Sequence, residues 1–316
     1  MPRCGPSLTR RVGSYTNLVT NQNVSNTRRP YFLGCPGWAC DDWVDSFYST
    51  GNRQRWLGQY TRVFNSVEGN STFYGLPKLE TVQRWADSAA EGFEFVLKFP
   101  RVISHDKELV HADRNVGEFL EVLQLLKDAN RLGPAFLQLP PFFSGRQLPD
   151  LAAFLEKLPN DFHYSVETRH ADYFDQGSVE REFTRLLGEL KIDRMLFDSR
   201  ALFSSPPTDE WEFESQTRKP RSPVRQTVTG SRPVLRLIGR NDIPSVRPWM
   251  EQWAKIVAGW IGKGLTPYIF THAPNNAYAP LAARQFHSIL TEYIPALPPL
   301  SDWPSEEVQK QQSLFE

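Results

Sequence analysis

Short apolar runs alternate with longer amphipathic segments along most of this chain. Apolar runs that end in proline, glycine or polar residues are typical of buried strands. Eight stretches predict strands over residues 31–34, 67–74, 93–98, 134–139, 163–167, 194–198, 234–238 and 267–271. Segments with apolar residues three and four positions apart predict the helices. These helices span residues 55–64, 79–90, 114–129, 149–158, 179–190, 248–261 and 281–293.

The order of these elements predicts the fold class. Eight strands that alternate with helices are typical of an α/β fold, here a single closed (β/α)8 barrel of the TIM type over residues 30–294. Residues 199–232 hold four prolines and no sustained apolar period, and they predict a long loop after the sixth strand. A doubly wound open sheet is the alternative, although no glycine-rich phosphate-binding motif follows the first strand.

Composition excludes several classes of protein. The 36 Lys and Arg residues balance 36 Asp and Glu residues, so net charge gives no general attraction to nucleic acids or membranes. No apolar run approaches the ~18 residues that cross a bilayer. The three cysteines fit neither a disulfide framework nor zinc-ligand spacing. We therefore predict a cytoplasmic protein, with no prediction of its oligomeric state.

Both ends of the chain differ from the middle. Residues 1–29 contain five arginines and no acidic residue, a composition similar to that of an organellar transit peptide. A disordered tail is the simpler interpretation of this segment, because no amphipathic stripe stands out. Residues 295–316 begin in a proline-rich stretch and predict a frayed C-terminal tail.

Polar residues gather where the predicted strands end. Glu68 and Asn70 lie two positions apart, so that they share one face of a strand. In a (β/α)8 barrel the C-terminal ends of the strands build the active site, and buried charges are normally paired or functional. The polar residues predicted at these ends are Glu68, Asn70, Lys98, Arg101, Gln138, Glu167, Arg169, His170, Asp198, Arg200, Arg236, Arg240, His272, Asn275 and Asn276. A structural network of mutually neutralised charges is the alternative for any one of them.

Three chemistries fit these residue types. Carboxylates and imidazoles at strand ends suit a divalent metal ion that activates water. The metal ligands of this hypothesis are Glu68, Glu167, Asp198 and His272, with His170 as an alternative. The second hypothesis is metal-free acid–base chemistry by Glu68 and Glu167, as in a glycosidase. The third is a cradle for a phosphate or carboxylate, which arginine forks bind through two hydrogen bonds. Its residues are Lys98, Arg101, Arg169, Arg200 and Arg236.

Other residues near the predicted strand ends have two interpretations each. Aromatic residues around Trp38 and Tyr74 stack on a sugar or base in one interpretation and pack beneath loops in the other. Cys35 is a candidate nucleophile, but a structural thiol is the simpler interpretation. Lys219 belongs to a Lys-Pro-Arg stretch that predicts an exposed loop, with substrate clamping as the alternative.

Several motifs resemble those of the YecE-like proteins, the family named domain of unknown function 72. The motifs are Gly34-x-x-Gly37-Trp38, Asn70-Ser71-Thr72-Phe73-Tyr74, Phe93-x-Phe95-x-x-Lys98-x-Pro100-Arg101, Gln138-Leu139-Pro140-Pro141, Val166-Glu167-x-Arg169-His170 and Asp198-Ser199-Arg200. The resemblance covers roughly residues 31–287 and implies a TIM-type barrel without an established activity.

Two departures from the family pattern concern the last two strands. Many members read Arg-x-His-Gly where this chain has Arg236-Leu237-Ile238-Gly239. Many also end the eighth strand in Asn-Asn, where this chain has Thr271-His272 and carries its asparagines at positions 275 and 276.

Together these observations predict an enzyme that acts on a small or polymeric anionic substrate, a hydrolase of phosphate esters. The catalytic residues of this hypothesis are Glu68, Glu167, Asp198 and His170. Its substrate-binding residues are Asn70, Tyr74, Lys98, Arg101, Gln138, Arg169, Arg200, Arg236, Asn275 and Trp38. A non-catalytic protein that binds nucleic acid or a phosphorylated metabolite is the alternative from another class.

Overall fold

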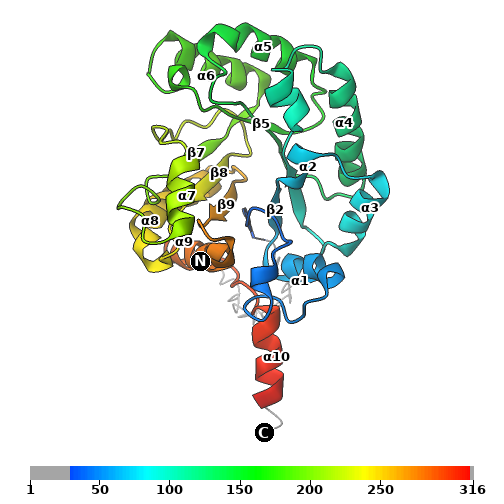
Figure 1. The fold of residues 1–316 in the computed structure, drawn as a ribbon, viewed down its shortest axis with the longest axis vertical. Helices are drawn as coiled ribbons and strands as arrows, with labels where there is room; N and C mark the ends of the chain where they lie inside the picture. The colour runs from blue at the N-terminus through cyan, green and yellow to red at the C-terminus, as the bar shows by residue number, and fades with distance from the viewer. Residues whose placement is uncertain (1–28, 314–316) are drawn as a thin grey trace, which may run out of the picture.

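The computed structural model describes residues 29–313 and places short parallel strands inside a layer of helices (Figure 1). The strands are β1 (Phe32–Gly34), β2 (Ser66–Gly69), β3 (Glu94–Leu97), β4 (Ala135–Gln138), β5 (Tyr164–Glu167), β6 (Asp193–Arg194), β7 (Leu196–Asp198), β8 (Val234–Ile238) and β9 (Tyr268–His272). The helices are α1 (Trp56–Val63), α2 (Ser71–Tyr74), α3 (Leu79–Ser88), α4 (Asp113–Asp128), α5 (Leu148–Lys157), α6 (Ser178–Leu190), α7 (Glu210–Arg218), α8 (Arg247–Gly262), α9 (Ala279–Tyr293) and α10 (Pro304–Ser313).

Hydrogen-bonded ladders divide the strands into three parallel sheets, with the orders β1-β9-β8-β7, β2-β3 and β4-β5-β6. Contacts also join neighbouring sheet edges. Glu68 N donates to Cys35 O at 3.1 Å, and Lys98 forms a parallel bridge with Phe136. Only Met195 separates β6 from β7. The predicted α/β class with parallel strands is confirmed, but the ladders form three sheets instead of the predicted single closed one.

Alternate residues along the strands point toward the interior between the three sheets or toward the helices. Inward side chains from five of the strands and from Met195 form an apolar plug, which consists of Phe32, Val96, Phe136, Met195, Val234, Tyr268 and Phe270. Outward residues such as Val67 and Val166 join the larger core under the helices. Two positions beyond four of the plug residues the inward side chains are polar, and these are Lys98, Gln138, Arg236 and His272. The plug therefore forms the floor of a polar layer at the C-terminal ends of the strands.

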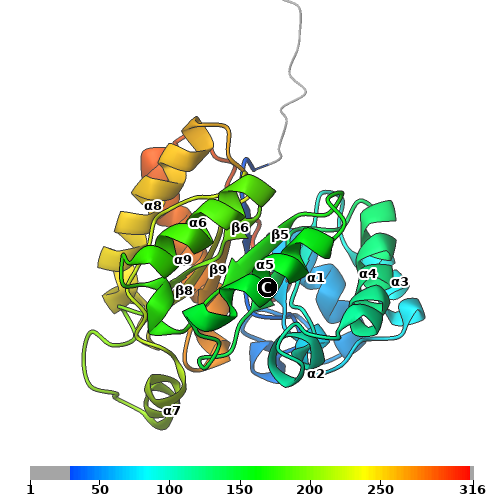
Figure 2. The same ribbon diagram turned by 90° about the horizontal axis from the view of Figure 1, so that it is seen from above.

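Two predicted segments in the middle of the chain differ from the structure. The predicted strand 67–74 ends at Gly69, and residues 71–74 form the short helix α2. The predicted loop 199–232 contains α7, which stands apart from the other helices in Figure 2. Its apolar residues Trp211 and Phe213 are exposed, so the segment lacks the amphipathic pattern that predicts a packed helix.

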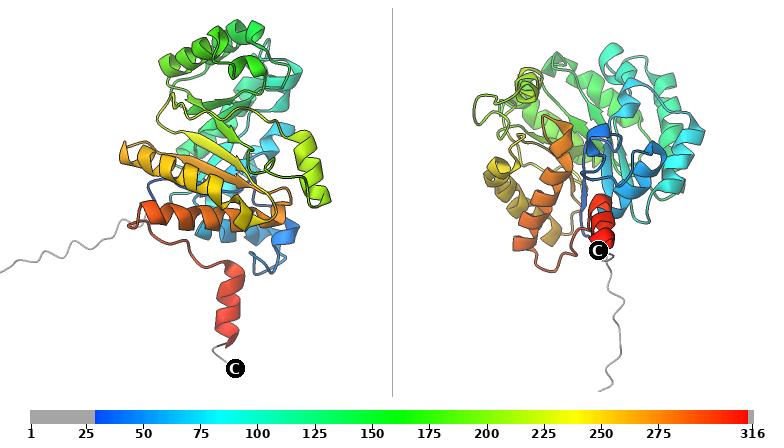
Figure 3. Two further views of the ribbon diagram at one scale, coloured as in Figure 1. Left: turned by 90° about the vertical axis from the view of Figure 1, so that its left-hand side faces the viewer. Right: turned by 60° about the horizontal axis from the view of Figure 1, so that its bottom comes forward.

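The prediction that the chain frays from Pro295 is wrong, because α10 lies in this segment and its start is anchored. The Arg284 guanidinium lies 3.6 Å from the centre of the Trp303 ring and pairs with Glu306 at 2.8 Å. Ser305 N also donates to Phe47 O at 3.2 Å. From this anchor α10 extends away from the main body (Figure 3).

Two predictions concern membranes and the N-terminal segment. None of the helices within residues 29–313 is both long and apolar enough to cross a bilayer. The predicted targeting segment or disordered tail lies outside the described residues, apart from Arg29 itself.

Candidate functional site

Arg236 lies between two buried carboxylates at the C-terminal ends of the strands. Its Nε and Nη2 atoms each donate to Glu68 at 2.9 Å, and its Nη1 atom donates to Glu167 at 2.6 Å. Arg236 is 4% exposed, and the two glutamates are 0% and 1% exposed. Strands β2, β5 and β8 each contribute one residue, so three sheet segments must be in place before this cluster forms. We call these three residues the carboxylate–arginine cluster.

Two further side chains complete the surroundings of Glu68. Asn70 Nδ2 donates to Glu68 Oε1 at 2.7 Å, and His272 Nε2 lies 3.0 Å from Glu68 Oε2. Burial raises the pKa of the Glu68 carboxyl, but Arg236 and His272 outweigh it and hold this pKa well below its usual value. Burial lowers the pKa of His272 to about 4, so the ring is neutral near pH 7. Because an ionised carboxylate only accepts hydrogen bonds, His272 carries its proton on Nε2.

Glu167 is held in the same way from the other side of Arg236. Arg169 Nε donates to Glu167 Oε1 at 2.9 Å, and this arginine is 16% exposed. Burial raises the pKa of Glu167, but Arg236 and Arg169 lower it to about 2. Both glutamates are therefore ionised throughout the physiological pH range, and neither carries a proton to donate.

Lys98 lies next to this cluster and is 7% exposed. Its Nζ atom donates to Gln138 Oε1 at 3.0 Å, an oxygen that also accepts from Arg169 Nη2 at 3.0 Å. The same ammonium lies 3.8 Å from the centre of the Phe73 ring. Burial and the nearby Arg236 charge lower the pKa of Lys98 to about 7, against the opposing effect of the two glutamates. The amine therefore exchanges its proton near neutral pH.

Lys219 brings a further positive charge from the segment that contains α7. Burial, followed by the Arg236 charge, lowers the pKa of Lys219 to about 8. Glu68, Arg169 and Glu167 also influence this pKa, which places the ammonium close to the cluster. The segment is tied to the end of β7, because Ser199 Oγ donates to Pro220 O at 2.7 Å. The Lys-Pro-Arg stretch is a loop and Arg221 is exposed as predicted, but the Lys219 side chain is half-buried at the site.

Positive charge exceeds negative charge among these residues. Four cationic side chains meet two carboxylates, which leaves a surplus of two positive charges when both lysines are protonated. The cations are Arg169, Arg236, Lys98 and Lys219, and the carboxylates are Glu68 and Glu167. Burying charge that has no counter-ion is costly, so this surplus favours an anion at the outer side of the cluster.

Asp198 does not join the cluster. Its carboxylate accepts from Trp253 Nε1 of α8 at 2.7 Å and from Arg200 Nη2 at 2.7 Å. The neighbouring residue Phe197 faces the cluster instead, with its ring 5.7 Å from Arg236 Cζ. Because adjacent strand residues point in opposite directions, Asp198 and its partner Arg200 are turned toward the helix.

The predicted metal ligands are therefore not brought together. Within the part of the chain that the structure describes, no group of three or more His, Cys, Asp and Glu side chains is arranged to hold a metal ion. The carboxylates of Glu68 and Glu167 are bound by arginine, and Asp198 is turned away. His170 caps a helical turn, because its Nδ1 atom accepts from Asp172 N at 3.2 Å. The metal hypothesis lacks its ligand set here.

The remaining predicted residues lie outside this cluster. Arg101 pairs with Asp106 at 3.1 Å near the surface. Tyr74 is 83% exposed. Both residues, together with Phe73, line a small cavity of about 280 Å³. Asn275 caps a turn by accepting from Ala277 N.

The structure also shows the surroundings of Trp38 and Cys35. Trp38 packs edge-on against Trp85 with ring centres 5.1 Å apart, which is the packing interpretation of this aromatic residue. Cys35 is fully buried, and burial raises the pKa of its thiol far above the neutral range. A nucleophilic thiolate is therefore disfavoured at this position.

Comparison with known proteins places the chain in a family. Residues 32–306 match the family described as "Protein of unknown function DUF72". The chain belongs to the DUF72 family. It is 37% identical over 284 residues to the UPF0759 protein YecE of Escherichia coli K12, an alignment that covers 90% of this chain and 99% of that protein. The resemblance predicted from the motifs is thus confirmed.

Solved structures of DUF72 proteins share the fold. A DUF72 protein of Thermotoga maritima superposes with a TM-score of 0.62 at 19% identity, and the match covers 82% of this chain and 98% of the other. One from Enterococcus faecalis V583 gives a TM-score of 0.62 at 18% identity, with 83% and 95% covered. At this identity the two structures support the α/β architecture of this DUF72 protein and nothing about its activity.

The pKa of Lys98 predicts an unusual pH dependence of stability. The value is about 7 in the folded protein, whereas an unfolded lysine has a pKa of about 10.4. Between these values the unfolded chain binds the extra proton, so the free energy of unfolding should rise as pH increases from about 7 to about 10. Lys98→Met should be more stable than the wild type near pH 7 and should lose this advantage at alkaline pH. Urea unfolding at several pH values measures this difference.

Lys255 provides the matched control, because it is an exposed lysine on α8. The Lys255→Met variant should keep the pH dependence of the wild type. If Lys98→Met also keeps it, Lys98 titrates like an ordinary lysine and this prediction is wrong.

The segment that carries Lys219 depends on one buried ion pair. Glu212 of α7 is 0% exposed and accepts from Arg240 Nε at 3.1 Å and from Asn241 N at 3.1 Å. Glu212→Gln should weaken this anchor and speed trypsin cleavage after Arg218 by about tenfold, because a hydrogen bond to a charged group is worth ~1.5–3 kcal/mol. Limited proteolysis measures the change. Glu210→Gln, on the exposed face of the same helix, should cleave like the wild type.

Proposed function

We propose that this DUF72 protein is a hydrolase of an anionic, phosphate-bearing substrate that binds at the C-terminal ends of the strands. The positive charge surplus around the carboxylate–arginine cluster, which is two when Lys98 is protonated and one when it is neutral, carries this proposal. Arg169 and Lys219 are the cations at its outer side, and they are partly accessible. Arginine forks bind phosphate oxygens through two hydrogen bonds, and a lysine adds a point charge.

Lys98 supplies the group that transfers a proton. A pKa of about 7 leaves about half of the amine neutral at neutral pH, the condition in which a general base works best. In the proposed step the neutral Nζ atom accepts a proton from a water molecule as the water oxygen forms a bond to phosphorus. The bond from phosphorus to the ester oxygen breaks, and the leaving alcohol then takes up a proton. Gln138 positions the amine, since it accepts a hydrogen bond from Nζ.

Glu68 and Glu167 act as positioning residues in this proposal. A glycosidase needs one carboxyl group that is protonated near neutral pH. Both carboxyl groups here have lowered pKa values because of Arg236, which disfavours the glycosidase-like alternative. Their function is to hold Arg236, whose charge lowers the pKa of Lys98.

The test is a screen for phosphate release. We would incubate the purified full chain with phosphate monoesters, phosphate diesters and sugar phosphates, each with and without EDTA. The expected result is phosphate release from one class that EDTA does not inhibit. Arg169→Gln should raise KM about tenfold or more through the loss of charge-assisted hydrogen bonds, and Lys255→Gln should not change KM. Release that requires an added metal ion would contradict the proposal.

A binding protein is the other outcome of this screen. If no substrate class is hydrolysed but inorganic phosphate binds and Arg169→Gln weakens that binding, the site is an anion-binding site without catalysis. The positive charge surplus supports binding in either case. The neutral fraction of Lys98 is the observation that favours an enzyme.

We also propose that residues 30–294 form one domain whose strands close into a (β/α)8 barrel. The contacts between β1 and β2, between β3 and β4, and across Met195 support closure. Glu68 N donates across the gap between β1 and β2, so slow amide exchange at this position would support closure of the barrel and fast exchange would contradict it.

We propose a cytoplasmic location, which fits the free thiols Cys35 and Cys40. Fractionation of the cell tests that location.

A further inference from the structure

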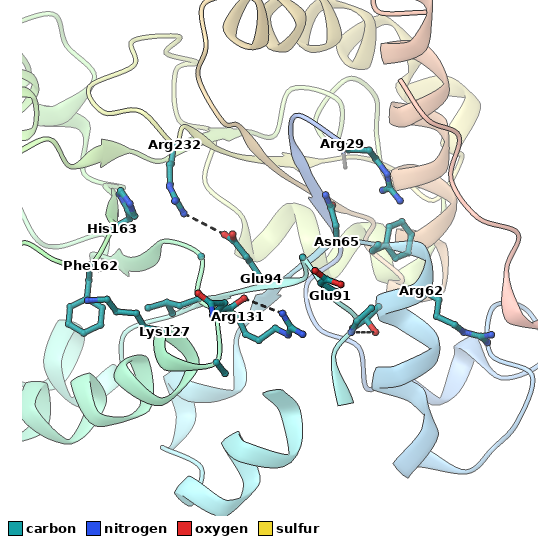
Figure 4. A pocket seen from close by; sticks show the side chains of 18 of the residues that line it. Arg29, Arg62, Asn65, Glu91, Glu94, Lys127, Arg131, Phe162, His163 and Arg232 are labelled. Carbon is teal, nitrogen blue, oxygen red and sulfur yellow. Dashed lines mark hydrogen bonds and ion pairs between the residues drawn. The ribbon is translucent and has the colours of Figure 1, made fainter. Parts of the chain in front are cut away.

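A second polar cavity lies at the opposite end of the strands. It has a volume of about 1380 Å³ and is lined by the segments that precede β2, β3, β4, β5 and β8 (Figure 4). Because the strands are parallel, these segments lie at the N-terminal strand ends, away from the carboxylate–arginine cluster. The apolar plug separates the two ends. We call this space the lower cavity.

Positive charge also exceeds negative charge in the lower cavity. Five cationic residues line it, namely Arg29, Arg62, Lys127, Arg131 and Arg232, against the three acidic residues Glu91, Glu94 and Asp161. Lys127 pairs with Asp161, and Arg232 pairs with Glu94 at 3.5 Å. Among the described residues, no carboxylate pairs with Arg29 or Arg131. Arg62 pairs with Glu307, which lies outside the cavity lining, so Arg29 and Arg131 are left with Glu91 alone and give the cavity an excess of one positive charge.

Both of these arginines bury a nitrogen atom that has no hydrogen-bond partner among the described residues. The atoms are Arg29 Nη1 and Arg131 Nε. Arg131 uses its other nitrogens only in long contacts of 3.3 and 3.4 Å with the carbonyl oxygens of Asn130 and Ala89. Burial lowers the pKa of Arg29, which means that its charge is poorly solvated. A buried donor without an acceptor costs free energy, so both side chains would gain hydrogen bonds by turning these nitrogens toward an oxygen-rich anion in this space.

We propose that the lower cavity is a second binding site, for a small phosphate-bearing anion held by Arg29 and Arg131. Phosphate offers several acceptor oxygens and a charge of opposite sign, and guanidinium groups bind it with directional hydrogen bonds. At about 1380 Å³ the cavity exceeds the roughly 300–1,000 Å³ of ordinary ligand pockets, so it has room for such an anion and for the group that carries it. This site is distinct from the one proposed for hydrolysis, because the two lie at opposite ends of the strands.

Hydrogen exchange with inorganic pyrophosphate tests this proposal on the full chain. Pyrophosphate at about ten times its Kd should slow exchange roughly tenfold in peptides that cover residues 90–94 and 127–133. Peptides that cover residues 98–106 and 167–170 report separately on the site proposed for hydrolysis. Protection confined to the peptides that cover residues 98–106 and 167–170, or no protection anywhere, would overturn the proposed binding site in the lower cavity. Protection confined to the peptides that cover residues 90–94 and 127–133 would support the site in the lower cavity, even if no hydrolysis is found.

Variants decide which residues hold the ligand. Arg131→Gln and Arg29→Gln should each weaken pyrophosphate binding at the lower cavity by about tenfold or more. Arg114→Gln removes the same charge from an arginine whose side chain is 88% exposed, and it should not weaken this binding. Arg131→Lys keeps the charge but loses Nε, so it should bind less tightly than the wild type even if Arg131→Gln fails to fold. Unchanged protection of residues 127–133 in Arg131→Lys and Arg29→Gln would overturn the assignment.

Discussion

Replacing Arg236 with methionine is expected to lower the free energy of unfolding by about 3–5 kcal/mol. The substitution keeps most of the side-chain volume but removes the charge between Glu68 and Glu167. Two carboxylates would then lie buried without the cation that holds both of them. Breaking a buried ion pair by removing one partner costs more than the pair contributes, because the remaining charge stays desolvated. Equilibrium unfolding in urea near pH 7 measures this loss.

The pH dependence of this loss follows from the glutamates. Their pKa values are lowered in the folded wild type, so their contribution is present above the unfolded value of about 4.3 and is lost as pH falls toward the folded value of about 2 for Glu167. Without Arg236, burial raises both values, and protonation stabilises the variant. The deficit of Arg236→Met should therefore shrink between about pH 5 and pH 2.

Two controls separate this effect from the loss of any arginine. Arg236→Lys keeps a charge but loses the paired hydrogen bonds to Glu68, and its loss should lie between those of the wild type and Arg236→Met. Arg53→Met removes an exposed arginine that pairs with Asp41 at the surface, and it should unfold like the wild type. A change below about 1 kcal/mol in Arg236→Met would mean that the carboxylate–arginine cluster is not formed as described.

Lys98→Met is expected to reduce the proposed phosphate release by about 10²–10⁴-fold, the usual contribution of a general base. The same variant should be more stable than the wild type near pH 7, because it no longer buries a charged amine. Lost activity together with gained stability identifies a residue retained for function, whereas a structural residue loses both. Steady-state kinetics on the substrate found in the screen measures the activity.

A second variant and the pH dependence of the rate distinguish two roles of Lys98, namely supplying a positive charge and accepting a proton. Lys98→Arg keeps a positive charge but does not deprotonate near neutral pH, so it should be as inactive as Lys98→Met. In the wild type, kcat/KM should fall below a pKa of about 7, because the amine must be neutral to accept a proton. Full activity in Lys98→Arg would contradict the role of Lys98 as a base and leave it a role in binding.

The alternation of inward and outward strand residues explains which of the predicted site residues the structure brings together. Glu68, Lys98, Glu167 and Arg236 occupy inward positions at the strand ends, where the sequence-based hypothesis placed polar contacts. Asp198 is also a charged residue at a strand end, but its side chain points outward, toward the helices. The predicted strand 194–198 is divided at Met195 into the two short strands β6 and β7. The sequence does not reveal this interruption, and so it does not reveal which residues of β7 point inward. The inward residue is Phe197, so a shift of one position removed Asp198 from the cluster.

Long-range contacts explain the features that sequence reasoning missed. Lys219 reaches the cluster only because its segment is anchored by Ser199 and by the pair of Glu212 with Arg240, which lie 21 and 28 positions apart from their partners. Trp303 docks on residues far away in the chain, so the proline-rich end gave no local sign of order. Hydrophobic periodicity reports on local faces and carries no information on such contacts.

The pKa of the Lys98 amine is the measurement that tests the central claim most directly. It is accessible by NMR of protein labelled with ¹³C at the lysine side chains, with Lys98→Met to assign the signal. We expect a pKa of about 7 in the free protein and a higher value when inorganic phosphate binds beside the amine. A value near 10.5, unchanged by phosphate, would contradict both the buried cationic site and its proposed function.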